Sequence, residues 1–412
     1  MDQRRDEPGL RSESVRRANL SSIARELHNT GPLSRSELGA RTGLTRSTIR
    51  ALIGEFAAAG LVSEVGSTSL GTPGRPSVVV TPNGARPTAL ALEIAVDSIA
   101  GAVVGFGGEI RQLRRIERPR GELSLEQTVT DLAALARQLD GFHTRRGDVI
   151  GVGVAIVGVV RHSDGLVSLA PNLGWHDVAL GQALRQVIGA FVPLSVANEA
   201  DLGALAETRR GGARGCANVI FISGEVGVGG GLIVDGRPMA GAAGYGGEVG
   251  HMPINPEGAT CHCGSTGCWE TEIGEDALLV KAGRERGGGR SAMDALLRDA
   301  RAGDATALAA LDHIARWLGL GLAGLVNLLN PQRIVLGGRF GRLFPFVVDT
   351  IGRQLDRYAL DAPRRLVTVV PAELGEDAGL LGAAELAFEP FLSDPATWLK
   401  PRSSTLPALA SA

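Results

Sequence analysis

The sequence predicts an α/β protein preceded by a small domain that is mainly helical. Residues 15–82 combine short helical stripes of apolar residues with turn residues and end in two short strands, whereas residues 88–390 alternate buried strands with helices. The strand and helix order begins again near Ala217, which suggests two α/β halves with a cleft between them. A chain of 412 residues is also too long for one ordinary core.

The charge of the chain divides near the same boundary. Residues 1–86 carry 12 Arg and 8 acidic residues, a net charge of +4, whereas the rest carries 30 basic and 36 acidic residues, a net charge of −6. A basic module ahead of a larger acidic one suits a nucleic-acid-binding domain. The apolar stretch Trp317–Val326 is too short to cross a bilayer, and the charged N-terminus lacks a signal-peptide core. We therefore expect a cytoplasmic protein without a membrane partner.

The N-terminal segment contains the pattern of a helix-turn-helix. After a first apolar stripe that ends near Leu27, Ser34 is followed three residues later by Glu37, which is the capping-box spacing at the start of a helix. Gly43 ends that short helix, and Thr45 caps the next one. The apolar residues of this next helix share one face: Ile49, Leu52, Ile53 and Phe56. Two helices joined by a Gly-containing turn are typical of a DNA-binding motif.

The second helix of this motif is predicted to contact DNA. Its polar residues lie at the N-terminal end, where such helices meet base edges in the major groove. Strands expected at 61–64 and 77–80 form a hairpin, and the loop 71–76 between them is the expected wing tip. A helical hairpin used only for protein contacts is the alternative. The candidate DNA contacts are Thr45, Arg46, Ser47, Arg50 and Arg75.

The larger segment begins with buried strands. Strands are expected at 89–96 and 101–106, followed by a turn at Gly107–Gly108 and a third strand. A helix near 123–139 and a buried strand at 149–156 complete the first half. The second half begins with strands at 219–223 and 229–234 and continues with a long insert, helices and further strands. This order strongly favours an α/β fold.

Three of the four cysteines lie within eight positions of the long insert. Cys261, Cys263 and Cys268 follow His251, and three thiolates with one imidazole match a closed tetrahedral zinc site. Such tight clustering favours a metal over disulfides. Four protein ligands leave no open position, so a structural zinc is expected. His262 is the alternative to His251 as a ligand, and free thiols in a loop are the alternative to a metal.

The run Glu248–Glu270 resembles the signature of the ROK family (repressors, open reading frames and kinases). Further segments are similar to other family regions: Pro171–Trp175, Val196–Ala200, Gly224–Gly231, Asn327–Pro331 and Gly375–Gly379. The resemblance covers about residues 10–390 and implies a duplicated actin-like fold of the hexokinase type. Together with the predicted winged helix-turn-helix, it implies the repressor branch, which is similar to xylose- and N-acetylglucosamine-responsive regulators.

The same resemblance implies a sugar site. Carboxylates and amides suit this role because they bind paired hydroxyl groups in a mostly closed cleft. His251 would serve twice, since a zinc-bound imidazole has a fixed orientation and presents its second nitrogen to the sugar. The residues implied are Asn172, Asn198, Glu199, Glu248, His251 and Glu270.

The sequence departs from the family's kinases where the nucleotide phosphates would bind. Those kinases have an Asp and a Gly-Gly-Thr at the end of the first strand, but the corresponding segment here is Leu92–Asp97. Asp97 places a negative charge where phosphate belongs, and Glu225 adds another in the second phosphate loop. Glu199 stands at the catalytic Asp position and is one methylene longer. These differences predict a protein that binds a sugar without phosphorylating it.

The predicted organisation is a flexible tail (1–14), a winged helix-turn-helix (15–82), a sugar-binding domain with a zinc loop (88–390) and a second flexible tail (393–412). We expect sugar to close the cleft and to alter the angle between paired DNA-binding heads in a homodimer or homotetramer. The expected partners are a double-stranded DNA operator and a sugar or sugar phosphate. A zinc-containing sugar kinase and a constitutive DNA-binding protein with an empty cleft are the alternatives.

Overall fold

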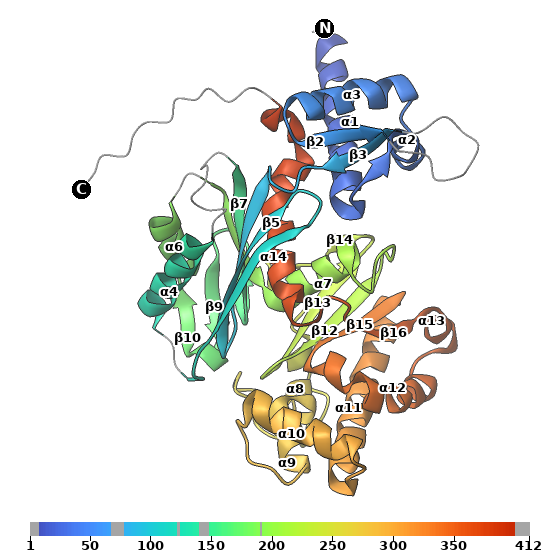
Figure 1. The fold of residues 1–412 in the computed structure, drawn as a ribbon. Helices are drawn as coiled ribbons and strands as arrows, with labels where there is room; N and C mark the ends of the chain where they lie inside the picture. The colour runs from blue at the N-terminus through green and yellow to red at the C-terminus, as the bar shows by residue number, and fades with distance from the viewer. Residues whose placement is uncertain (1–7, 67–77, 122–123, 140–147, 190–191, 400–412) are drawn as a thin grey trace, which may run out of the picture.

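The structure is a computed structural model that describes residues 8–66, 78–121, 124–139, 148–189 and 192–399. It contains a small N-terminal head and a two-lobed body, and the head lies above one end of the body (Figure 1). The head consists of three helices and a small antiparallel sheet with the strand order β1-β3-β2. Its elements are α1 (Pro8–Thr30), β1 (Leu33–Ser34), α2 (Arg35–Thr42), α3 (Arg46–Ala58), β2 (Val62–Gly66) and β3 (Val78–Pro82).

The local signals of the head are confirmed. Ser34 and Glu37 form a complete capping box at the start of α2, and Gly43 ends that helix with a φ of 70°. The hydroxyl of Thr45 accepts a hydrogen bond from the amide of Thr48 at the start of α3. The apolar face of α3 is buried in the head, and β2 pairs with β3 as the predicted hairpin. The head is therefore a winged helix-turn-helix.

The first lobe is built around a sheet with the order β11-β7-β4-β5-β6, in which β4, β7 and β11 are parallel and β5 and β6 are antiparallel additions. A smaller sheet, β10-β9-β8, lies beside it. The elements are β4 (Thr88–Ile94), β5 (Ser98–Gly105), β6 (Ile110–Glu117), α4 (Leu125–Gln138), β7 (Val149–Ile156), β8 (Val159–Arg161), β9 (Leu166–Ala170), η1 (Pro171–Leu173), β10 (Trp175–Val178), α6 (Leu180–Ile188) and β11 (Leu194–Asn198).

The second lobe repeats this topology. Its sheet has the order β14-β13-β12-β15-β16, with β12, β15 and β16 parallel and β13 and β14 antiparallel. The strands are β12 (Val219–Gly224), β13 (Val228–Val234), β14 (Arg237–Pro238), β15 (Arg333–Gly338) and β16 (Thr368–Pro371). Since both sheets place the first strand at the centre, with parallel partners on one side and a meander on the other, the fold is a duplicated α/β fold.

The remaining elements follow the order of the chain. They are α7 (Glu199–Arg210), η2 (Val249–His251), α8 (Trp269–Ile273), α9 (Glu275–Lys281), α10 (Gly289–Arg301), α11 (Ala305–Leu329), α12 (Arg339–Tyr358), α13 (Asp361–Leu366), η3 (Gly375–Asp377), α14 (Ala378–Ser393) and η4 (Pro395–Trp398). Helix α11 is long and apolar enough to span a membrane, but 61% of its most apolar window is buried in the fold, which identifies it as a core helix of the second lobe.

Part of each segment expected to be a tail has regular structure. Helix α1 begins at Pro8, so residues 8–14 are helical. At the other end, η4 packs against both α1 of the head and α14 of the body, and Trp398 lies edge-on to Phe391 with ring centroids 6.0 Å apart. The segment directly after Ser393 thus makes packing contacts with the fold. Residues 1–7, 400–412 and the wing segment 67–77, which includes Arg75, lie outside the described residues.

Candidate sugar and metal site

The two lobes enclose a cavity of about 370 Å³, and all six residues expected to bind a sugar line it. They come from distant parts of the chain, because the ends of strands and helices from both lobes meet there. The loop after β9 supplies one residue, the junction of β11 and α7 supplies two, and the segment around η2 and α8 supplies three. These residues are Asn172, Asn198, Glu199, Glu248, His251 and Glu270.

Asn198 has a structural role at the edge of this cavity. Its Oδ1 accepts a hydrogen bond of 2.7 Å from the amide of Ala200 and caps α7, while its Nδ2 donates to the carbonyl of Gly158 at 2.9 Å. These contacts join the start of α7 to the end of β7 in the first lobe. Asn198 therefore fixes the direction in which the next residue, Glu199, points.

Glu199 is the side chain best prepared to receive a hydroxyl group. Its Oε2 is buried and has no hydrogen-bond partner among the described residues. Desolvation, followed by the charges of Glu225 and Glu93, raises the pKa of Glu199 to about 8. A buried carboxyl without a partner is costly, and a ligand hydroxyl would remove that cost.

Two further acids share this environment. Burial raises the pKa of Glu248, and burial together with the charge of Glu248 raises the pKa of Asp201 to about 7. Asp201 lies in the first turn of α7, one residue beyond the segment that the family resemblance identified. Clusters of carboxyls with raised pKa values are typical of functional sites, because structure alone does not require them.

The cysteine cluster has the dimensions of a metal site. The ligand atoms of His251, Cys261, Cys263 and Cys268 all lie within 4.8 Å of one another. The Sγ atom of Cys261 is 3.7 Å from Nδ1 of His251, and the Sγ atoms of Cys263 and Cys268 are 3.7 Å apart. Two thiolates bound to a tetrahedral zinc at about 2.3 Å would lie about 3.8 Å apart, so these residues fit the ion. The exposed His262 lies outside this group of four.

Glu270 connects the metal cluster to the cavity. Its Oε1 is 2.9 Å from Sγ of Cys261, and its Oε2 accepts a hydrogen bond of 3.3 Å from the amide of Val228. A side chain at Gly227 would meet this carboxylate, since a Cβ atom there would lie 2.7 Å from Oε2. The glycine in this turn thus allows Glu270 to reach the second lobe's sheet.

A second, smaller cavity of about 60 Å³ lies where the family's kinases were expected to hold phosphate. Its acidic lining includes Glu93 and Glu225. Arg115 forms an ion pair of 2.7 Å with Glu93 and another of 2.9 Å with Asp377. Burial, opposed by Arg339, raises the pKa of Glu225 to about 7. Because Arg115 is paired with both Glu93 and Asp377, its positive charge is already balanced by carboxylates of the protein.

Four of the five residues expected to contact DNA are among the described residues, and they lie together on the head. Thr45, Arg46, Ser47 and Arg50 are all exposed at the N-terminal end of α3. The hydroxyl of Thr45 is 2.9 Å from that of Ser47 and also caps the helix. Neither Arg46 nor Arg50 forms an ion pair with any described residue.

Some lining residues were missed by sequence reasoning. The cavity is also lined by Lys281, Arg286 and His313, which come from α9, the turn after it and α11. They lie outside the motifs, and isolated basic residues carry no local signal. Lys281 is one of only two lysines in the chain, and this rarity is the sole hint that the sequence offers.

The fold and cavity define a protein with a duplicated, two-lobed α/β body and a winged helix-turn-helix head. A family model described as "ROK family" matches residues 89–389, and the chain belongs to that family. This confirms the resemblance and the fold class predicted from the sequence.

Relatives similar over most of the chain include a repressor. The xylose repressor of Bacillus subtilis strain 168 is 28% identical over 380 residues, which cover 92% of this chain and 97% of that protein. The glucokinase of Halalkalibacterium halodurans is 34% identical and covers 61% of this chain and 80% of that enzyme. A solved ROK family transcriptional regulator, a homologue of the Escherichia coli MLC protein, is 24% identical, has a TM-score of 0.73 and covers 93% and 99% of the two chains.

Proposed function

We propose that the protein is a sugar-responsive transcriptional repressor of carbohydrate metabolism genes, whose head binds operator DNA and whose cavity binds a sugar without phosphorylating it. One observation carries this proposal: the six polar residues line a single cavity in a chain that also has a winged head. The similarity to a xylose repressor over 92% of the chain supports it, because that similarity extends across both parts.

The proposed DNA interface is the N-terminal end of α3, with Thr45, Arg46, Ser47 and Arg50, assisted by Arg75 of the wing. Arginines that contact phosphates or guanine bases bind DNA in a salt-dependent manner. The variants Arg46→Ala and Arg50→Ala should therefore weaken binding. If the replaced arginine binds a phosphate, the salt dependence of binding should also fall by about one unit of slope. Arg316→Ala on α11, whose partner is Asp312, is the matched control.

The proposed zinc ligands are His251, Cys261, Cys263 and Cys268. When bound, the ion holds the loop between η2 and α8 in shape and leaves the second ring nitrogen of His251 for the sugar. Metal analysis of the purified protein should give one zinc per chain, and Cys268→Ser should lose it. The variant His262→Ala should keep the ion. Loss of zinc from this variant would instead identify His262, and not His251, as the fourth ligand.

A sugar kinase is the second candidate, because the glucokinase of Halalkalibacterium halodurans is 34% identical to this chain. One feature argues against it. Acidic side chains line the second cavity, and its arginines, Arg115 and Arg290, are already paired with carboxylates, so neither is free to bind a nucleotide phosphate. Sugar-dependent consumption of ATP by the purified protein would establish the kinase instead.

The assembly proposed is a homodimer or homotetramer in the cytoplasm, since paired heads are needed to recognise two operator half-sites. The decisive experiment is fluorescence anisotropy of the full-length protein on the DNA upstream of its own gene. We expect binding that weakens with salt and that is released by one member of a panel of sugars and sugar phosphates, including D-xylose and D-glucose. Binding that no member of the panel alters would favour a constitutive regulator.

A further inference from the structure

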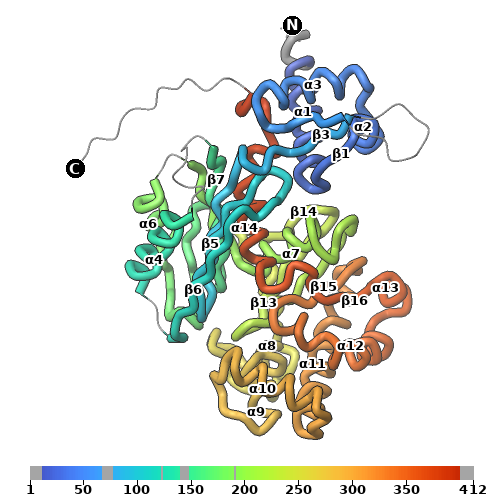
Figure 2. The backbone as a smooth tube through the Cα atoms, in the orientation of Figure 1, coloured from blue at the N-terminus to red at the C-terminus, as the bar shows by residue number. Residues whose placement is uncertain are grey.

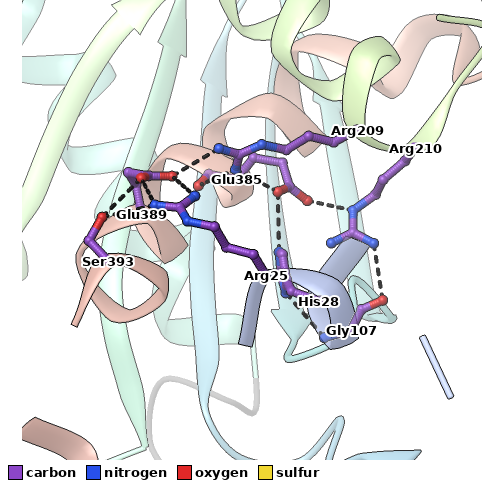
Figure 3. Close-up of polar contacts among 8 residues, drawn as sticks. All are labelled: Arg25, His28, Gly107, Arg209, Arg210, Glu385, Glu389 and Ser393. Carbon is purple, nitrogen blue, oxygen red and sulfur yellow. Dashed lines mark hydrogen bonds and ion pairs between the residues drawn. The ribbon is translucent and has the colours of Figure 1, made fainter. Parts of the chain in front are cut away.

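Beside a shared apolar core, the head meets the body through a partly buried polar cluster, here called the joint (Figure 3). The joint consists of Arg25, His28, Gly107, Arg209, Arg210, Glu385 and Glu389. His28 lies on α1 of the head and is fully buried, and Glu385 lies on α14 of the body with its side chain 2% exposed. Nε2 of His28 is 3.2 Å from Oε2 of Glu385. A fully buried polar contact between domains is specific, because leaving either group unpaired is costly.

The hydrogen bonds determine the state of His28. Its Nδ1 accepts a bond of 3.2 Å from the amide of Gly107, so the ring proton must lie on Nε2 and point at Glu385. Burial lowers the pKa of His28, which favours this neutral form. The imidazole ring also packs against the ring of Phe388 on α14, with the ring centroids 4.4 Å apart. His28 therefore joins the head to α14 both by oriented hydrogen bonds and by an apolar ring contact.

Helix α7 holds the other side of the joint. Arg209 donates to Glu385 at 2.9 Å and to Glu389 at 2.8 Å. Arg210 pairs with Glu385 through Nε and donates from Nη1 to the carbonyl of Gly107 at 3.0 Å. Both arginines are the last two residues of α7, whose first residue is Glu199 in the cavity. One straight helix of twelve residues thus links the cavity to the joint, over about 18 Å.

Helices α7 and α14 lie side by side and form one unit (Figures 1 and 2). Their backbones approach so closely at Gly382 that a Cβ atom there would lie 2.0 Å from the carbonyl oxygen of Leu202. Packing this tight allows no independent sliding of the two helices, since close-packed interiors transmit displacement. A movement of the start of α7 must therefore also displace Glu385.

We propose that the α7–α14 unit carries the state of the sugar cavity to the DNA-binding head, and that the bond between His28 and Glu385 is where the head receives it. This inference rests on the proposed function and adds the structural connection through which the sugar cavity affects the DNA-binding head. His28, Arg209 and Arg210 are positioning residues, because they touch neither sugar nor DNA. A sugar that engages Glu199 shifts α7, and the joint converts this shift into a new orientation of α1.

The first test measures coupling in the full-length protein. His28→Phe keeps an aromatic ring beside Phe388 but removes both hydrogen bonds. The DNA dissociation constant is measured by anisotropy with and without saturating D-xylose or D-glucose, whichever binds in calorimetry. We expect the sugar-induced change in this constant to fall at least tenfold in His28→Phe while the sugar affinity stays within twofold. His28→Gln, which keeps a donor and an acceptor, should retain most of the coupling.

His176→Phe is the matched control, because His176 is 75% exposed on β10 and lies outside the joint. Thermal unfolding checks that each variant is folded. Coupling in His28→Phe equal to that of the unmodified protein would overturn the inference. If the unmodified protein binds DNA but responds to no sugar, the proposed function fails, and the second test decides the inference separately.

The second test needs no sugar. Asn198→Ala removes the cap of α7 at the cavity, and its effect on DNA affinity is measured with His28 present and with His28→Phe. We expect at least a fivefold change in the first background and less than a twofold change in the second. If the two sites do not communicate, Asn198→Ala should change DNA affinity by the same factor with His28 present and with His28→Phe. Equal factors, or no change in either background, would refute the route through α7.

Discussion

Two buried glutamates at opposite ends of α7 experience opposite surroundings. Glu199, at the N-terminal end, has an oxygen without a partner among the described residues, and desolvation raises its pKa to about 8. Glu385, beside the C-terminal end, is paired with His28, Arg209 and Arg210, and its pKa is well below the usual value because these groups outweigh desolvation. An unpaired acid is prepared for a ligand, whereas a fully paired acid holds two parts of the fold together.

The largest expected effect concerns stability. Glu385→Ala leaves Arg210 and the buried His28 without their carboxylate and removes one of the two carboxylate partners of Arg209, which should cost about 3–5 kcal/mol of unfolding free energy. Glu199→Ala removes an unpaired acid, so it should cost less than about 1 kcal/mol or should stabilise the body. Urea unfolding followed by tryptophan fluorescence gives both values. Equal losses in the two variants would remove the proposed distinction between the two ends of α7.

The second expected effect concerns ligand affinity. Removing one partner of a buried hydrogen bond costs about 1–3 kcal/mol, so Glu199→Ala should weaken sugar binding about 5- to 150-fold. Calorimetry with the sugar that the unmodified protein binds measures this effect. Arg365→Ala is the control, because Arg365 is exposed on α13 and does not line the cavity, and this variant should leave sugar affinity within about twofold. Unchanged affinity in Glu199→Ala would show that the free oxygen does not face the ligand.

The third expected effect is a difference in pH dependence. The pKa of Glu199 rises from 4.5 to about 8 on folding, so between these values the folded protein keeps a proton that the unfolded chain releases. Stability from this group therefore falls as pH rises, by up to about 1.4 kcal/mol per pH unit. The pKa of Glu385 is lowered, so its contribution is complete above pH 4.5 and is lost only in acid.

Between pH 5 and pH 8, Glu199→Gln should accordingly gain stability relative to the unmodified protein, whereas the loss in Glu385→Gln should stay constant. Urea unfolding at four pH values gives both differences. If the Glu199→Gln difference does not change with pH, then Glu199 is ionised in the folded protein over this whole range.

The sequence predicted those parts of the molecule whose signals are local. The capping box of Ser34 and Glu37, the cap at Thr45 and the cysteine cluster each lie within a few residues, so spacing alone identifies them. The cavity needed the family resemblance, because Asn172 and Glu270 are far apart and neither is distinctive by itself. The prediction of the tails depended on composition, which gives no sign of the contact between Trp398 and Phe391.

The joint was beyond sequence reasoning. His28 and Glu385 are separated by 357 positions, and a single histidine near the end of a largely polar helix gives no sign that it is paired. Only the duplicated fold brings α1, α7 and α14 together. Long-range polar contacts of this kind depend on tertiary structure, since each partner satisfies a group that is buried by another part of the chain.

The smallest expected effect separates two roles of Asn198 at the cavity end of α7. Asn198→Ala removes the cap to the amide of Ala200 and the bond to the carbonyl of Gly158, and removal of the cap alone should cost about 1 kcal/mol. Asn198→Ser keeps a capping oxygen but cannot reach Gly158. If capping dominates, the serine variant should lose less than half as much unfolding free energy as the alanine variant. Equal losses of unfolding free energy in the two variants would instead show that the hydrogen bond to Gly158 is the more important contact of Asn198. The start of α7 would then be held in place by the first lobe and not by its own cap.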